Sequence, residues 1–235
     1  MTGRLITTMQ DLRPGDQFLG PIGGWVGVGV GLGLDALGEA FRAGALDIKH
    51  AGMLVPGLLP GDPVRLAQAM PHGAEIVDLD PAKHWTEKCA YVRLPEDYPG
   101  QALDAAMIAT LMVREGVDYG FLSYPALAAY KFGVRNERLR NWINRRRDPV
   151  IVDWPSGRRK EATVALPVEA ICSVFNDQCE TLAGKDLVDN THPQAVTPGK
   201  LADVLSTYDG AVWARPRGIN LPARTWRING EGDYF

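Results

Sequence analysis

The chain has 235 residues, of which 46% are hydrophobic and 23% are charged, and its formal net charge is −3. This is the composition of a globular protein, and it excludes a general nucleic-acid binder, which needs a strongly basic surface. The chain has only three cysteines, an odd number, so a disulfide framework is excluded and we expect reduced thiols.

No internal repeat or long low-complexity linker divides the chain. We therefore expect one domain over residues 1–216, followed by a polar, poorly ordered tail over residues 217–235. The N-terminus lacks a basic start followed by an apolar core, so no secretory signal is predicted. The expected location is the cytoplasm, with association to a phage-type particle as the alternative.

In chain order, turn residues followed by an apolar run predict a strand over residues 13–22. Apolar residues at helical spacing predict a short helix over residues 34–46. Strands that cluster in the first half and helices in the second favour the α+β fold class. The other predicted strands are 48–59, 73–80, 89–97 and 211–216, and the other predicted helices are 101–116, 121–133, 136–148, 168–184 and 196–210.

An apolar run with no charge extends from Phe18 to Leu34, but it contains Pro21 and seven glycines. These features favour buried or surface-apolar structure over a membrane span, so membrane contact through Ile22 to Leu34 is not predicted. Within it, residues 31–36 fit the loose G-x-G-x-x-A form of a dinucleotide fingerprint. No acidic residue follows about 20 positions later, so a nucleotide site is not predicted either.

The arginine-rich segment and the spacing of the cysteines lead to two further expectations about partners and metals. Six arginines between Arg135 and Arg147 predict a solvated helix face, with a patch for an anionic partner as the alternative. The spacing of Cys89, Cys172 and Cys179 does not fit a zinc site. Neither a metal nor an organic cofactor is predicted.

Cys172 and Cys179 lie seven residues apart on one predicted helix and share a face. Burial in a core explains both, because free cysteine is among the most buried residue types. A nucleophilic thiol instead needs a base and a polar group that orients the base. Only His50 stands at the head of an apolar strand. Asp78, on a strand expected to pair with it, or Glu75 could accept the second N–H of the imidazole.

Several segments resemble the circularly permuted branch of the NlpC-like, papain-fold cysteine peptidases (YiiX-like proteins). In that branch a P-G-D segment opens the domain, a histidine begins a strand of the form H-x-G, and the nucleophile comes last, in a C-S pair that opens a helix. The resemblance runs from about Leu12 to Trp213. The segments that carry it are RPGD (13–16), HAGMLV (50–55), AEIVDL (74–79), VRLPED (92–97), GVDYGFL (116–122), ICSVFNDQC (171–179) and TPGKLADVLS (197–206).

The resemblance implies a papain-like fold, with an antiparallel sheet packed against helices, and a triad of Cys172, His50 and Asp78. It implies acyl transfer through a thioester, with Tyr119 and Ser173 as contacts of the substrate or the transition state. The backbone N–H of Cys172 would contribute to an oxyanion site. If Pro167 starts the helix, the nucleophile falls in the second turn, where the helix dipole helps a thiolate less.

The substrate implied by the resemblance is a peptide or acyl compound, and we favour a cell-wall peptide or isopeptide bond. A lipid-directed thioesterase or acyltransferase is the alternative, with the run from Ile22 to Leu34 lining an acyl site. A catalytically silent binding or particle-structural protein is a further alternative. Cys179 is expected to be a core residue in all of them.

Overall fold

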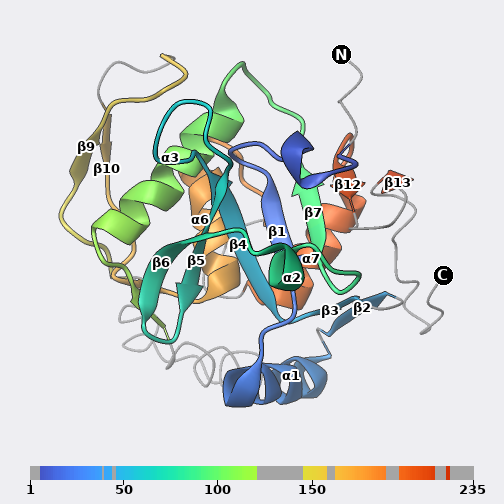
Figure 1. The fold of residues 1–235 in the computed structure, drawn as a ribbon. Helices are drawn as coiled ribbons and strands as arrows, with labels where there is room; N and C mark the ends of the chain where they lie inside the picture. The colour runs from blue at the N-terminus through green and yellow to red at the C-terminus, as the bar shows by residue number, and fades with distance from the viewer. Residues whose placement is uncertain are drawn as a thin grey trace.

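The computed structural model of the chain describes residues 6–38, 40–43, 46–120, 145–157, 162–188, 196–214 and 221–222. At its centre is a seven-stranded sheet with helices packed against it (Figure 1). Every neighbouring pair of strands in this sheet is antiparallel, and the fold class is α+β, as predicted. The strands, in spatial order, are β13 (Leu221–Pro222), β12 (Val212–Ala214), β7 (Ala90–Arg93), β1 (Gln17–Gly20), β4 (His50–Val55), β5 (Arg65–Met70) and β6 (Gly73–Asp78).

Short strands pair outside this sheet, and helices connect or cover its strands. The short pairs are β2 (Phe41–Ala43) with β3 (Leu46–Ile48), β8 (Asp118–Tyr119) with β11 (Glu169–Ala170), and β9 (Val150–Val152) with β10 (Ala162–Val164). The described helices are η1 (Met9–Asp11), α1 (Gly24–Leu37), α2 (Pro81–His84), α3 (Gln101–Arg114), α6 (Cys172–Leu182) and α7 (Pro198–Thr207).

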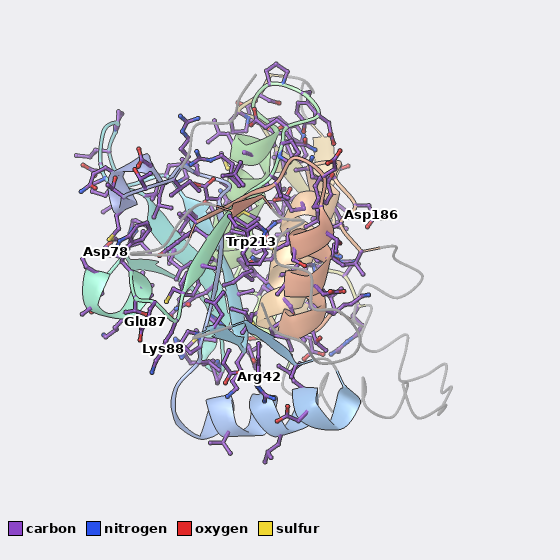
Figure 2. The ribbon with its side chains drawn as sticks, turned by 90° about the vertical axis from the view of Figure 1, so that its right-hand side faces the viewer. Arg42, Asp78, Glu87, Lys88, Asp186 and Trp213 are labelled. Atoms are coloured by element: carbon purple, nitrogen blue, oxygen red, sulfur yellow. The ribbon has the colours of Figure 1, made fainter. Side chains whose placement is uncertain are left out.

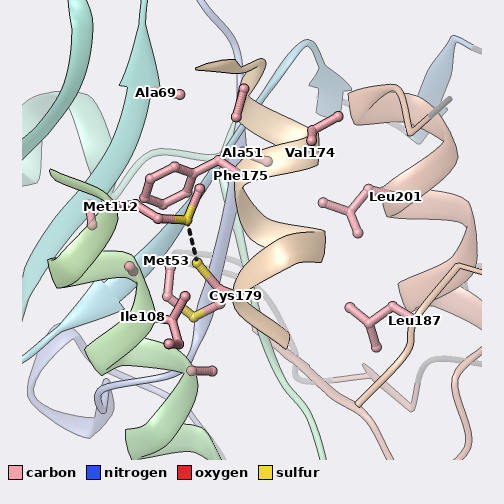
Figure 3. Packing of buried hydrophobic residues seen from close by; sticks show 14 of the residues in the cluster. Ala51, Met53, Ala69, Ile108, Met112, Val174, Phe175, Cys179, Leu187 and Leu201 are labelled. Atoms are coloured by element: carbon pink, nitrogen blue, oxygen red, sulfur yellow. Dashed lines mark hydrogen bonds between the residues drawn. The ribbon is translucent and has the colours of Figure 1, made fainter. Parts of the chain in front are cut away.

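The two faces of the sheet carry different side chains, because successive residues of a strand point to opposite sides. On one face, Ala51 and Met53 of β4 join the larger core with residues of α3 and α6 (Figure 3). On the other face, Leu54 packs with Phe18 and Leu66 in a smaller cluster. Figure 1 shows α6 behind β4 and β5, and the short α2 in front of the sheet.

Helix α6 is buried on all sides although its sequence is largely polar. Every residue from Cys172 to Glu180 is buried. The thiol of Cys179 donates to the sulfur of Met112 on α3 at 3.8 Å, and Leu201 of α7 lies on the other side of α6 (Figure 3). Cys179 is therefore a core residue, as predicted, and α6 packs between α3 and α7.

Most of the predicted elements are present, including the N-cap of α7, where Thr197 Oγ1 accepts a hydrogen bond from the N–H of Lys200 at 3.1 Å. The helix predicted over residues 34–46 is wrong. Instead the glycine-rich run itself forms α1, and Gly38, with a left-handed φ of 64°, ends that helix before β2 and β3. The sequence analysis also did not predict β5, which extends from Arg65 to Met70.

Within the part of the chain that the structure describes, no helix has the length and apolar content needed to cross a membrane. In the predicted tail, Leu221–Pro222 forms a strand paired with β12. The rest of that tail lies outside the described residues, as do the predicted helix over 121–133 and most of the one over 136–148. The last residues of the latter, Arg145 to Arg147, are not helical.

Candidate functional site

His50 begins β4, and a side chain of the neighbouring strand holds its ring. The Nε2 of His50 lies 2.7 Å from the Oε1 of Gln68 on β5, and the ring meets Phe18 edge-on, with 6.3 Å between the centroids. Burial lowers the pKa of His50 to about 4, although the hydrogen bond to Gln68 opposes this effect. The imidazole is therefore neutral at pH ~7, with a lone pair on one ring nitrogen.

A chain of hydrogen bonds continues from Gln68 to the protein surface. The Nε2 of Gln68 donates to Oε1 of Glu75 at 2.9 Å, and Oε2 of Glu75 lies 2.9 Å from the Nε2 of His72. The register places these groups side by side, because Gln68 is opposite Gly52 of β4 and opposite Glu75 of β6. Polar side chains thus link the buried imidazole to the exposed ring of His72.

Asp78 does not take part in this chain. Its strand, β6, pairs with β5 and not with β4, so that a whole strand separates Asp78 from His50. Asp78 is opposite Arg65, whose Nε donates to Oδ1 at 2.7 Å. Its side chain is 88% exposed, and Figure 2 shows it at the periphery of the molecule. The structure therefore does not bring Asp78 to His50, whereas Glu75, the alternative, reaches it through Gln68.

Gln68 is the hydrogen-bond partner of His50 that the sequence analysis missed. It lies in the segment RLAQAM, where it is a single amide between alanines in a strand whose central residues are all buried. A buried polar side chain needs a partner, and this was the available signal. It was not used because the strand itself was not predicted.

Cys172 is the first residue of α6, and Ile171 is the N-cap. The expectation that Pro167 starts the helix, with Cys172 in its second turn, is wrong, because Glu169–Ala170 forms a strand between them. The first-turn position favours a thiolate more, since the N–H groups and the dipole of a helix stabilise anions there. The isoleucine side chain offers no hydrogen-bond acceptor to these N–H groups.

The first half of α6 lies against the first half of β4. Asn176, one turn after Cys172, donates through Nδ2 to the carbonyl oxygen of Gly52 at 2.8 Å, and Gly52 is two residues after His50. A Cβ at Gly52 would lie 2.9 Å from the backbone oxygen of Ala67 and 2.6 Å from Cδ1 of Leu66, so that a larger residue would disturb the pairing of β4 with β5. Cys172 and His50 therefore lie at the same end of the contact between α6 and β4.

The imidazole and the helix nevertheless use different faces of the sheet. The contacts of the His50 ring with Phe18 and Gln68 are on the face opposite to α6, whereas the next residue, Ala51, packs toward α6. The Nδ1 of His50 is buried and has no hydrogen-bond partner among the described residues. The structure thus joins His50 to Gln68, and it places Cys172 at the same end of the contact between α6 and β4.

The two residues expected to contact substrate lie beside Cys172 in the chain or in space. Tyr119 of β8 pairs with Ala170, two residues before Cys172. Ser173 is fully buried, and its Oγ donates to the carbonyl oxygen of Val196 at 2.5 Å. This bond ties α6 to the segment before α7, which gives Ser173 a structural role in this arrangement.

The described arginines of the basic segment make contacts within the fold. The guanidinium of Arg147 donates to the carbonyl oxygens of Glu115 and Gly116, at 2.5 and 2.6 Å, and so caps the end of α3. Arg146 donates to Oε1 of Gln178 on α6 at 2.7 Å. These two side chains support the helices around the site, and the solvated face predicted for the rest of the segment lies outside the described residues.

Among the described residues, no group of three or more His, Cys, Asp or Glu side chains could hold a metal ion. A search with protein-family models finds no match to this chain, and a search of curated proteins finds none. Membership of the NlpC-like family therefore stays a prediction from the sequence segments that resemble it.

Proposed function

We propose that this chain is a cysteine hydrolase of the papain-like type, with Cys172 as the nucleophile and His50 as the base. One observation carries the proposal. A neutral, buried imidazole is held through Nε2 by Gln68, its Nδ1 has no described partner, and His50 begins β4 at the end where α6 begins. Its ring lies on the face of the sheet opposite to α6, so the proposed reaction requires the imidazole and the Cys172 thiol to meet at this end of β4. Catalytic hydrogen bonds are often long or unformed before substrate binds.

In the proposed reaction, His50 takes the proton of the Cys172 thiol, and the thiolate attacks the carbonyl carbon of an amide or ester. The C–N or C–O bond then breaks, and the leaving group takes the proton from the imidazolium. Water, deprotonated by the same imidazole, hydrolyses the thioester and releases a carboxylic acid and the free thiol. Gln68 replaces Asp78 as the residue that orients the ring.

For the substrate, we propose a peptide amide bond, of the cell-wall peptide or isopeptide kind that the sequence resemblance implies. A lipid-directed thioesterase or acyltransferase is the second candidate. It is favoured by the apolar surface of α1, where Val28 and Leu32 are 53% and 67% exposed. A lipid-directed enzyme should bind fatty-acyl ligands more tightly than cell-wall peptides. If the chain binds neither class of ligand, this candidate is excluded.

The dyad predicts that Cys172 reacts with iodoacetamide at pH ~6, well below the ordinary pKa of a thiol near ~8.5. The reaction should be lost in His50→Ala, because no base then takes the proton from the Cys172 thiol. The measurement is the rate of alkylation at each cysteine as a function of pH, read by peptide mass spectrometry on the folded protein.

Cys179 is an internal control in the same experiment. It is fully buried, and burial raises the pKa of its thiol, so it should stay unlabelled until the protein unfolds. If Cys172 is as inert as Cys179 in the native protein, the proposal fails. The chain is then better described as a binding or particle-structural protein that retains this arrangement as packing.

A further inference from the structure

The carboxylate of Glu75 determines which end of the Gln68 amide faces His50. A carboxylate only accepts hydrogen bonds, and Oε1 of Glu75 accepts one from the Nε2 of Gln68 at 2.9 Å. The amide oxygen of Gln68 must then point the other way, toward His50. A reversed amide would place its oxygen against the carboxylate oxygen, with two acceptors facing each other and a donor lost.

The orientation of the amide in turn determines the tautomer of His50. The Oε1 of Gln68 lies 2.7 Å from the Nε2 of His50. Since this oxygen can only accept, the proton of the neutral imidazole must be on Nε2. His50 is 3% exposed, so the surrounding protein and not bulk water decides which ring nitrogen carries the proton. The lone pair is then on Nδ1, the buried ring nitrogen without a described partner.

We infer that Glu75 is a positioning residue that sets the tautomer of His50 through Gln68, although it does not touch the imidazole. Each link crosses one strand boundary, from β6 to β5 and from β5 to β4. His72 holds the second carboxylate oxygen of Glu75 at 2.9 Å, which leaves Oε1 for the amide. The tautomer follows from the hydrogen bonds alone, and only its catalytic consequence rests on the proposed function.

The test is the tautomeric state of His50 in the full chain labelled with ¹⁵N-histidine. Long-range ¹H–¹⁵N correlation spectra distinguish the protonated ring nitrogen from the one with the lone pair. A His50→Gln spectrum identifies the His50 signals among those of the four histidines. The wild type is expected to show the proton on Nε2.

Two substitutions at Glu75 should move the tautomer by different amounts. In Glu75→Gln the new amide can face Gln68 with either end, so both tautomers should be populated and Cys172 alkylation should fall about twofold. In Glu75→Lys the ammonium can only donate, so Gln68 should reverse and place the proton on Nδ1. Alkylation of Cys172 should then fall by about 10²-fold, the low end of what a general base contributes.

Asp78→Asn is the matched control, because it changes a carboxylate on the same strand that lies outside the chain of hydrogen bonds. It should leave the His50 tautomer as in the wild type. A proton on Nδ1 in the wild type would overturn the inference. So would a wild-type tautomer in both Glu75 variants, and Glu75→Gln alone decides the matter if the lysine variant does not fold.

The outcome can be separated from that of the proposed function. If the tautomer changes in the Glu75 variants but Cys172 is inert in the wild type, the inference stands and the hydrolase proposal fails. If Cys172 is reactive in the wild type and the proton of His50 stays on Nε2 in every Glu75 variant, the hydrolase proposal stands and Glu75 has no positioning role.

Discussion

Replacing Arg93 with alanine is expected to lower the free energy of unfolding by about 3–5 kcal/mol, because the Asp16 carboxylate then stays buried without its counter-charge. The Nε and Nη2 of Arg93 donate to the two carboxylate oxygens of Asp16 at 2.7 and 2.6 Å. Asp16 is 2% exposed, and burial raises its pKa even with Arg93 present. Urea unfolding at neutral pH measures the loss.

The ion pair of Asp16 with Arg93 gives the segment RPGD a structural role in the turn before β1. The carboxylate of Asp16 also accepts from the N–H of Arg13 at 2.9 Å, which closes the turn before β1. The carbonyl oxygen of Asp16 accepts from the N–H of Leu54, and the N–H of Gly15 donates to the carbonyl oxygen of Leu54, both at 2.8 Å. The turn is thereby fixed to the far end of β4, the strand that begins with His50.

Arg65→Ala is the matched control for Arg93→Ala. Its N–H···O distance to Asp78 is the same 2.7 Å, but Asp78 is 88% exposed. An exposed pair contributes about 0–1 kcal/mol, so this variant should unfold close to the wild type. If the two variants lose the same free energy of unfolding, the burial of Asp16 does not determine the cost of removing its partner.

The elements that could be predicted from the sequence are those with a complete local pattern. The strand HAGMLV is a short run of apolar residues that begins at His50, and α3 has helical spacing closed by Gly116, which is left-handed with φ 64°. The helix predicted over residues 34–46 failed at Gly38. A left-handed glycine there ends α1, and the pattern before it, apolar residues alternating with glycine, has no clear helical period.

The candidate site was predicted only in part, because the partner of a strand residue depends on which strand lies beside it. His50 could be predicted from the pattern of its own strand. Its neighbour Gln68 could not, since β5 was not recognised and Asp78 was expected on the adjacent strand. The alternation of a strand could have narrowed the choice, because Glu75 and Asp78 are three residues apart and point to opposite faces. Only one of them can share a face with Gln68.

The pH dependence of stability should contain two opposing contributions from buried groups. Burial raises the pKa of Glu180 from 4.5 to about 7, against the effects of Gln17 and Lys185. Between these values the folded state holds a proton that the unfolded state has released, so the free energy of unfolding falls as pH rises. His50, with its pKa lowered from 6.5 to about 4, acts in the opposite direction. The changes that Glu180 and His50 cause in the free energy of unfolding occur over overlapping pH ranges and largely cancel.

Glu180→Gln should remove one of these contributions and leave the other visible. The new amide oxygen can still accept from the Nε2 of Gln17, which donates to Oε1 of Glu180 at 3.1 Å, and Lys185 keeps its bonds to Pro95 and Asp97. Because the glutamine cannot ionise, the variant avoids the cost of burying a carboxylate above pH ~7.

Unfolding curves of Glu180→Gln and wild type at matched pH values measure this contribution, since groups common to both cancel in the difference. The variant should be about as stable as the wild type at pH ~4. Its advantage should grow to about 3 kcal/mol at pH ~8, at about 1.4 kcal/mol for each pH unit between the two pKa values. A difference that does not change with pH would mean that Glu180 does not titrate differently in the folded and unfolded chains. A growing difference would place an uncharged carboxylic acid in the last turn of α6, about two turns from Cys172.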